Sequence, residues 1–479
     1  MSNISNQPNL KKELTLLLIS FLISIFLIKK IFKSKNPSIK IRLLLIIFSL
    51  IILFFPIFFT KKYNIFITNN KIDLYLWQPI INCNQNGILF CFYDDLKNIR
   101  NPSPENYNQQ NINQIYSNLP SLKETSRNSE AEGLKPNVIV IMSEALFDVT
   151  QLPEIKYSQD PIKNIRSDIK STFISPIFGG ATANVEFELL TSFSNFFLNG
   201  KIPYSQSIRK DMPSLFSLFK EQGYLTTTIH PFYGSVFNRI TVYKHFSLDK
   251  FINLDNSSDY VNAGPFVSDQ SFTTKVINQL NSSNQPQFIF AISIQNHASF
   301  EANRFPNHKI NITSSLEGDN KSALQTYIDG INLSDESYLN LKNELNKSKK
   351  PTIIILYGDH LPFLGNDFDI YKKVDYIPNN QLDWSQEDYR KMYSTPIAVF
   401  ANFKTNFDFP KEMSPSFLSL EILKSANITP KYQFSYLQSI FPTDSVLNVY
   451  IPPKFTPEQL KDYELVQYDL IFGKQYGLK

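Results

Sequence analysis

The stretch NVIVIMSEA, residues 137–145, decides the fold, because it is a short continuous apolar run that ends in a carboxylate. A run of this length is typical of a strand that is buried on both faces of a sheet. Four similar runs recur along the chain, at residues 224–230, 288–297, 352–360 and 397–402. Segments with helical spacing separate them, at residues 212–222, 272–280 and 321–345. We therefore predict an α/β domain with a mainly parallel central sheet flanked by helices.

Titratable side chains follow four of these runs, where a strand would leave the sheet. They are Glu144, His230, His297, Asp359 and His360. In open α/β sheets, ligands bind at the carboxyl ends of the strands, so we expect these side chains at one edge of the sheet. Any one of them alone is more often structural than functional. Glu144, Asp359 and His360 together offer the oxygen and imidazole ligands that Mn²⁺ or Mg²⁺ accepts.

The segment FGGATANVEFELLTSFS, residues 178–194, joins a glycine turn to a predicted helix. Free backbone N–H groups at a helix start attract anions, and a metal or base can turn a threonine hydroxyl into a nucleophile. Thr182 stands at this junction. The alternative is a helix cap, with Glu186 supplying approximate capping-box chemistry, and spacing alone favours the cap. Further along, the fork of Arg239 suits phosphate oxygens, although a surface arginine is the commoner case.

The charge and the apolar runs indicate a membrane protein and exclude a general nucleic-acid binder. The chain of 479 residues has 47 basic and 43 acidic side chains, so no strong positive field exists. Residues 14–28 and 43–60 are apolar runs, and the first extends to residue 32 because Lys29 and Lys30 can snorkel. The two runs, 14–32 and 43–60, predict two transmembrane helices. The loop between them is basic and therefore cytoplasmic, which places both termini outside the cytoplasm. A signal peptide is disfavoured, because no small-residue cleavage site follows the first run.

The predicted organisation has four parts: a membrane anchor, a spacer, a catalytic domain and a tail packed on that domain. Their bounds are residues 1–62, 63–135, 136–445 and 446–479. The spacer is extracytoplasmic and rich in Asn, Gln, Ser and Pro, which is typical of mobile chain. Cys83 and Cys91 flank Asn86-Gly87, a hairpin-turn dipeptide. A disulfide and two buried thiols are both compatible with this spacing, and no zinc-finger pattern is present.

Six motifs occur in an order that matches a known family. They are NVIVIMSEA, GGATANVEFELLT, HPFYGSVFNR, SIQNHASF, YGDHLP and YSTPIAVFAN. Over residues 136–426 the chain resembles the lipoteichoic acid synthase and phosphoglycerol transferase branch of the sulfatase and alkaline-phosphatase superfamily. The resemblance implies a sulfatase-like α/β domain and a transferase of substituted phosphate groups at the cell membrane. It implies a phosphatidylglycerol donor and an envelope glycan or glycolipid acceptor.

The resemblance also implies a role for each candidate residue. Thr182 would be the nucleophile and a metal ligand. The other ligands of a single Mn²⁺, or Mg²⁺, would be Glu144, Asp359 and His360. Arg239 and His297 match positions that hold the phosphate or glycerol group, and His230 matches a position near the substrate.

The chain departs from the family pattern in three respects. Full-length polymer synthases carry more membrane helices than the two predicted here, Phe237 stands where Trp is frequent, and Ala181 stands where Gly is common. The C/S-x-P-x-R motif of true sulfatases does not occur, so sulfate-ester hydrolysis is disfavoured. The alternatives on the same site are a phosphodiesterase or phosphatase, a phosphoethanolamine transferase, or a non-catalytic envelope-binding protein. The complete set of candidate ligands argues against the last.

Overall fold

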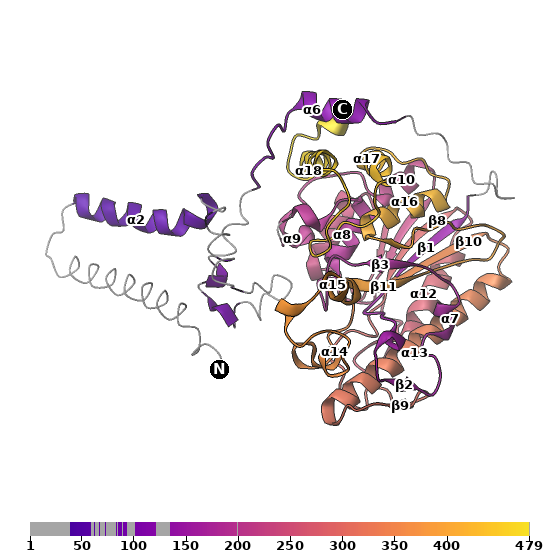
Figure 1. Cartoon of the computed structure of the whole chain (residues 1–479). Coiled ribbons are helices and arrows are strands. Elements are labelled where there is room, and N and C mark those ends of the chain that lie inside the picture. The colour runs from indigo at the N-terminus through magenta and orange to yellow at the C-terminus, as the bar shows by residue number, and fades with distance from the viewer. Residues whose placement is uncertain are drawn as a thin grey trace. The chain divides into compact units, whose positions relative to one another are not determined.

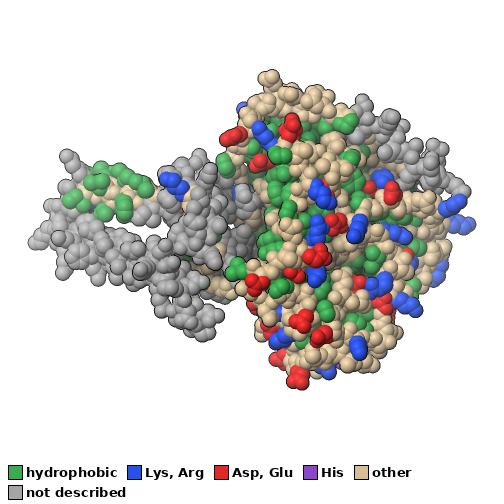
Figure 2. Space-filling model, in the orientation of Figure 1, with side chains coloured by type: hydrophobic (Ala, Val, Ile, Leu, Met, Phe, Trp, Pro, Cys, Tyr) green, Lys and Arg blue, Asp and Glu red, His purple; other side chains and the backbone are tan. Residues whose placement is uncertain are grey.

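The computed structural model describes residues 39–58, 101–120, 135–198 and 200–478, with a few positions between 62 and 92. The chain divides into two units, Met1–Pro102 and Ser103–Lys479. In the first unit, helix α2 spans Ile39–Phe58, and Figure 2 shows hydrophobic side chains gathered along it. No helix within the described residues is both long enough and apolar enough to cross a membrane. The first predicted transmembrane segment, residues 14–32, lies outside the described residues.

Cys83 and Cys91 form a disulfide, which resolves the alternative that the sequence left open. The expected hairpin turn between them is wrong. The amide of Gly87 donates to the carbonyl of Cys83 (2.9 Å), and the amide of Cys91 donates to the carbonyl of Gly87 (3.0 Å). This is the spacing of an α-helix, in which residues four apart bond to one another. Gly87 itself has a left-handed φ of 88°.

An eight-stranded sheet forms the centre of the second unit (Figure 1). Across the sheet the strands are β12 (Glu412–Met413), β3 (Ile169–Ile174), β11 (Ser394–Ala401), β10 (Thr352–Gly358), β1 (Asn137–Ser143), β8 (Gln287–Ile292), β4 (Leu225–Ile229) and β5 (Lys250–Ile252). The five strands from β10 to β5 are parallel, while β11 pairs antiparallel with both β10 and β3. The predicted mainly parallel α/β sheet is confirmed, and the five predicted strands are present.

Strand β1 contributes to two hydrophobic cores, one on each face of the sheet. Val138, Val140 and Met142 belong to one core, and Ile139 and Ile141 belong to the other. Alternate residues of a strand point to opposite faces, which explains why the run is apolar throughout. The first core is covered by α6 (Gln109–Ser117), α8 (Ala183–Thr191), α9 (Pro203–Gln206), α10 (Leu215–Glu221), α11 (Arg239–His245), α16 (Pro415–Ser425), α17 (Gln433–Ile440) and α18 (Pro457–Ile471). The second is covered by α7 (Lys163–Arg166), α12 (Asp269–Asn281), α13 (Gly318–Lys347), α14 (Asp369–Lys373) and α15 (Gln386–Tyr393).

Short elements complete the unit around this three-layer core. Two-stranded sheets pair β2 (Lys156–Tyr157) with β9 (Ile312–Thr313) and β6 (Asn262–Ala263) with β7 (Phe266–Val267). The 3₁₀ helices are η2 (Val149–Gln151), η3 (Asn195–Phe197), η4 (Val236–Asn238), η5 (Asn366–Phe368), η6 (Gln381–Asp383) and η7 (Tyr476–Leu478).

Two segments outside the predicted catalytic domain pack into the core of the second unit. Part of the expected spacer forms α6, in which Ile112 and Ile115 are buried in the first core. These residues lie three apart, so they share one face of the helix. The Tyr107 hydroxyl next to α6 donates to Asp469 of α18 (2.7 Å). The expected tail contributes α18, whose Tyr463 and Val466 are fully buried. Both segments are therefore part of the folded domain.

Candidate active site

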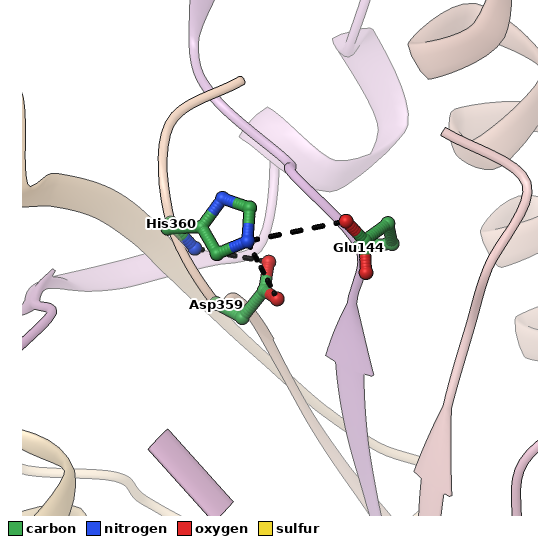
Figure 3. Close-up of side chains that lie close together, drawn as sticks. All are labelled: Glu144, Asp359 and His360. Atoms are coloured by element: carbon green, nitrogen blue, oxygen red, sulfur yellow. Dashed lines mark hydrogen bonds and ion pairs between the residues drawn. The ribbon is translucent and has the colours of Figure 1, made fainter. Parts of the chain in front are cut away.

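Glu144 and Asp359 directly follow the two central strands of the sheet. Strands β1 and β10 are parallel neighbours with Ser143 opposite Gly358, so the next residue of each strand leaves the sheet at the same level. Glu144, Asp359 and His360 are all buried, and their ligand atoms lie within 4.8 Å of one another. Figure 3 shows the three side chains pointing toward one another. The predicted gathering of these three residues at one sheet edge is confirmed.

The hydrogen bonds of this cluster leave two buried atoms facing each other. Asp359 Oδ1 accepts from the amides of Ala145 (2.8 Å) and His360 (2.9 Å). His360 Nδ1 lies 2.9 Å from the Leu361 carbonyl, so it donates there and a neutral ring has its lone pair on Nε2. His360 Nε2 lies 3.3 Å from Asp359 Oδ2 and 3.9 Å from Glu144 Oε1. Within the described residues, neither Nε2 nor Oδ2 has a hydrogen-bond partner.

The electrostatics of the cluster favour the binding of a cation. Burial raises the pKa of the Glu144 carboxyl, and the neighbouring Asp359 carboxylate raises it further. The positive charge of Arg239 acts in the opposite direction. Buried carboxylates are stable as anions only when a positive charge compensates them. Two carboxylates and one imidazole with unpaired, converging atoms therefore fit a divalent cation of the hard or borderline class.

The loop that carries Glu144 is fixed by α13 and by β8. The Tyr327 hydroxyl of α13 donates to the Ala145 carbonyl (2.6 Å) and accepts from the Phe147 amide (3.0 Å). The Glu144 amide donates to Ser293 Oγ, just after β8 (3.0 Å). Ala145 has a φ of 52°, a left-handed conformation that costs a non-glycine residue energy. These contacts hold the turn, and with it the Glu144 carboxylate, in place.

Thr182 occupies the N-cap position of α8, and its hydroxyl makes no capping hydrogen bond. The predicted helix start is confirmed, whereas the predicted capping chemistry is wrong. Glu186 does not complete a capping box, because its carboxylate bonds elsewhere. The turn before Thr182 has left-handed φ values of 69° at Gly179 and 64° at Ala181. The Gly179 amide donates to the Leu361 carbonyl (3.3 Å), which ties this turn to the loop that carries His360.

Arg239 is buried rather than exposed, which excludes the surface-arginine alternative. Its Nη2 donates to Glu186 Oε1 at 2.6 Å, and its Nε donates to the same oxygen at 3.0 Å. The hydroxyl of Tyr243, one turn further along α11, donates to Glu186 Oε2 at 2.6 Å. One edge of the guanidinium is therefore already occupied by a carboxylate of the protein.

The two other predicted site histidines, His230 and His297, differ in environment. His230 follows β4, is buried, and places Nδ1 3.1 Å from the Ile292 carbonyl. Burial, followed by the positive charge of Arg239, holds the pKa of His230 well below its usual range. His297 lies in the loop after β8 and is exposed, with its ring 5.3 Å from the ring of Phe266. Of the seven predicted site residues, His297 alone is exposed.

Comparison with known proteins shows the family of the chain. A family model described as Sulfatase matches residues 136–404, more than half of the chain. The chain belongs to the sulfatase family. The resemblance predicted from the six motifs is thereby confirmed, and all seven predicted site residues lie inside the sulfatase match.

The relatives include proteins named for cyclic β-1,2-glucan modification and for lipoteichoic acid synthesis. A putative cyclic β-1,2-glucan modification protein of Rhizobium meliloti is 35% identical over 423 residues, 84% of this chain and 64% of that protein. A lipoteichoic acid synthase of Staphylococcus saprophyticus is 27% identical over 295 residues, 57% of this chain and 43% of the synthase. This chain spans less than two thirds of the length of these curated relatives.

Two solved structures share the sulfatase-like fold. The phosphoglycerol transferase GacH of Streptococcus pyogenes, solved with sn-glycerol-1-phosphate, has a TM-score of 0.64 at 23% identity, covering 79% of this chain and 97% of GacH. The lipoteichoic acid synthase LtaP of Listeria monocytogenes has a TM-score of 0.52 at 15% identity, covering 78% of this chain and 98% of LtaP. At these identities the likeness shows the fold.

The sequence did not predict the contacts of Glu186 with Arg239 and Tyr243. Glu186 lies between Val185 and Phe187, and all three side chains are fully buried or nearly so. A buried carboxylate needs a cation or hydrogen-bond donors around it, because an unpaired buried charge is costly. That rule predicts buried partners for Glu186 without naming them. The sequence did not show that the partner would be Arg239, 53 residues further along the chain.

Proposed function

We propose that this chain is a metal-dependent phosphoglycerol transferase that acts on an envelope glycan or glycolipid. The observation that carries the proposal is the buried cluster of Glu144, Asp359 and His360, in which two ligand atoms lack partners. A turn bearing Thr182 is bonded to the same loop as His360, and the Thr182 hydroxyl is not used as a cap. A metal site beside an uncommitted alcohol suits phosphoryl transfer through a covalent intermediate.

The proposed metal is Mn²⁺, or Mg²⁺, held by Glu144, Asp359, His360 and the hydroxyl of Thr182. When bound, a divalent cation supplies positive charge that favours an alkoxide and stabilises phosphate oxygens. Mn²⁺ accepts an imidazole beside carboxylates more readily than Mg²⁺ does, which favours it here.

The proposed reaction has two displacements at one phosphorus atom. In the first, the oxygen of Thr182 forms a bond to phosphorus, and the bond to the diacylglycerol oxygen breaks. Diacylglycerol leaves with a proton, and the glycerol phosphate remains as an ester of Thr182. In the second, an acceptor hydroxyl forms a bond to phosphorus and returns the threonine oxygen with a proton. Each step is an ordinary nucleophilic displacement with balanced atoms.

Other residues of the chain have binding roles in this proposal. The amide groups at the start of α8 and the guanidinium of Arg239 face a phosphate group. His230 stays neutral at pH 7 because its pKa is depressed, so its Nε2 accepts a hydrogen bond from a substrate hydroxyl. His297, which is exposed, contacts the glycerol group in this proposal.

The proposed acceptor follows from the relatives, and the proposed location follows from the apolar runs. The Rhizobium meliloti relative is named for cyclic β-1,2-glucan, and it matches 84% of this chain, which favours an envelope glucan as acceptor. Residues 14–32 and 43–60 would anchor the chain, with the sulfatase domain outside the cytoplasm near a phosphatidylglycerol-like donor. The Cys83–Cys91 disulfide agrees with an oxidising compartment. Protease added to intact spheroplasts should therefore remove the domain, and protection of the domain would refute this topology.

Turnover of a labelled lipid tests the function. The full chain in detergent is incubated with Mn²⁺, head-group-labelled phosphatidylglycerol and a cyclic glucan, and diacylglycerol and labelled glucan are measured. We expect both products with the wild type and neither with Thr182→Ala. Thr191→Val is the matched control, because Thr191 lies at the other end of α8 and its hydroxyl donates to the Phe187 carbonyl (2.6 Å).

Three outcomes favour the alternatives instead. Label released only as free glycerol phosphate indicates a phosphodiesterase. Turnover of phosphatidylethanolamine in place of phosphatidylglycerol indicates a phosphoethanolamine transferase. Tight binding of glucan without any turnover indicates a non-catalytic envelope-binding protein.

A further inference from the structure

Glu186 and Arg239 form a charged pair that is almost completely buried. Their side chains are 0% and 2% exposed, and Nη2 of Arg239 lies 2.6 Å from Oε1 of Glu186. Nε of Arg239 also contacts both carboxylate oxygens, at 3.0 and 3.3 Å. The Tyr243 hydroxyl adds a third donor to the same carboxylate. Such a side-on, bidentate pair fixes the plane of the guanidinium as well as its position.

The pair connects the helix of Thr182 to the loop after β4. Glu186 lies four residues after Thr182, which places both on the same side of α8. Arg239 begins α11 directly after Phe237 and Asn238, whose φ values of 56° and 62° are both left-handed. Two successive left-handed residues that are not glycine are strained, and surrounding contacts must hold them. The Phe237 ring lies 5.2 Å from Cζ of Arg239, so the guanidinium is held by a ring and by a carboxylate.

The positive charge of Arg239 acts on His230, one of the predicted site residues. After burial, it is the strongest influence that lowers the pKa of His230. Glu186 is bonded by Nε and Nη2, so the other edge of the fork, which includes Nη1, is turned away from that carboxylate. A buried arginine with one edge fixed presents its second edge in a single direction. Its side chain therefore loses little conformational entropy when it binds an anion.

We propose that Glu186 is a positioning residue, which holds one edge of Arg239 so that the other edge faces the phosphate of the substrate. The proposal rests on the proposed function, since it concerns the same site. It assigns a role to a residue that would otherwise only be the partner of a structural ion pair. The helix that carries Thr182 then also sets the direction of the guanidinium, so the nucleophile and the phosphate-binding arginine keep a fixed relation.

Kinetic constants of matched variants test this role. Glu186→Gln keeps the shape of the side chain but removes its charge, and Glu186→Asp keeps the charge but shortens the side chain. Glu188→Gln is the control, because Glu188 is equally buried on the same helix and bonds to Ser194 and Asn195 instead. We expect both Glu186 variants to lower kcat/KM for phosphatidylglycerol about 10- to 100-fold, with a rise in KM. We expect KM of Glu188→Gln to stay within about twofold of wild type.

A double-mutant cycle separates positioning from stability. If Glu186 acts through Arg239, then Glu186→Gln has little further effect on KM in an Arg239→Ala background. A purely structural role lowers the amount of folded enzyme and leaves KM unchanged, so a KM within about twofold of wild type in both Glu186 variants overturns the proposal. If the Glu186 variants do not fold, Tyr243→Phe provides a second test, because it removes one hydrogen-bond donor to Glu186. It should raise KM less than Glu186→Gln does, and an unchanged KM in that variant counts against positioning.

Failure of the function and failure of the inference give different results. If the wild type releases no diacylglycerol, then the proposed function fails. If the wild type is active and the Glu186 variants match Glu188→Gln in KM, then only the positioning role fails.

Discussion

Gly358 and Leu146 approach so closely that a Cβ atom on residue 358 would lie 2.0 Å from the Leu146 carbonyl oxygen. The contact stands where β1 and β10 leave the sheet, between the turn that carries Glu144 and the loop that begins with Asp359. Only glycine allows this approach, because real Cβ contacts essentially never fall below 3.0 Å. The spacing between two of the candidate metal ligands therefore depends on the absence of one methyl group.

Gly358→Ala should separate these two loops and damage the cation site. We expect the affinity for Mn²⁺ to fall by at least tenfold and the free energy of unfolding to fall by about 1–3 kcal/mol. Isothermal titration calorimetry and thermal unfolding measure the two effects. Gly223→Ala is the control, because a Cβ there meets nothing within 4 Å and only its left-handed φ of 80° is strained. Wild-type Mn²⁺ affinity in Gly358→Ala would contradict this assignment.

Mn²⁺ should stabilise the folded chain through Asp359. At a concentration 100 times its dissociation constant, a ligand adds about 2.7 kcal/mol to the free energy of unfolding, so the melting temperature should rise. We expect Asp359→Asn to abolish this rise. Asp335→Asn should keep it, although Asp335 is also buried and accepts from the Ile165 amide (2.7 Å). Equal shifts in both variants would place the cation elsewhere.

Ala181→Gly should stabilise the domain, in contrast to most glycine substitutions. Ala181 has a φ of 64°, which costs a residue with a Cβ about 1–2 kcal/mol. Glycine removes this strain, but the added unfolded-state entropy costs about 0.4–1 kcal/mol, so we expect a net gain of about 0–1.6 kcal/mol. Ala183→Gly, two residues later in α8, should instead lose about 0.5–1 kcal/mol. Chemical denaturation measures both, and losses of similar size in the two variants would show that the turn is not strained.

The buried carboxyl of Glu188 should make stability depend on pH. Burial raises its pKa to about 7 from an ordinary value of 4.5, despite hydrogen bonds from Asn195 and Ser194. Between these values the folded state keeps a proton that the unfolded state has lost, so stability falls as pH rises through this window. Glu188→Gln removes the effect. The melting temperature of this variant relative to wild type should therefore rise between pH 4.5 and pH 7 and then stay level. A constant difference across the window would refute the shift.

The sequence predicted the centre of the fold because that centre is made of continuous apolar strands. Strands β1, β4 and β10 each end one residue before a predicted site residue, and β8 ends five residues before His297. Strand β3 was missed, because Lys170, Ser171 and Thr172 interrupt its apolar residues. An antiparallel strand near the sheet edge needs fewer apolar side chains than a central one. Helix α6 was missed for a related reason, since its two buried isoleucines lie within a polar segment.

The sequence predicted that the three candidate ligands lie together, but it did not predict the contacts that support them. The cluster of Glu144, Asp359 and His360 follows from strand exits, which the sequence shows directly. The contacts of Arg239 with Glu186 depend on how two helices pack, and no local pattern contains that information. The unused hydroxyl of Thr182 is a similar case, because whether a cap forms depends on backbone angles at a single residue.

Mass spectrometry of the nucleophile tests the proposed function most directly. The full chain is incubated with Mn²⁺ and phosphatidylglycerol without acceptor, quenched in acid and digested. We predict a glycerol phosphate ester on the peptide that contains Thr182, absent from Thr182→Ala and much reduced in Asp359→Asn. Turnover of phosphatidylglycerol with an unmodified Thr182, or with the ester on another residue, would contradict the proposed threonine intermediate.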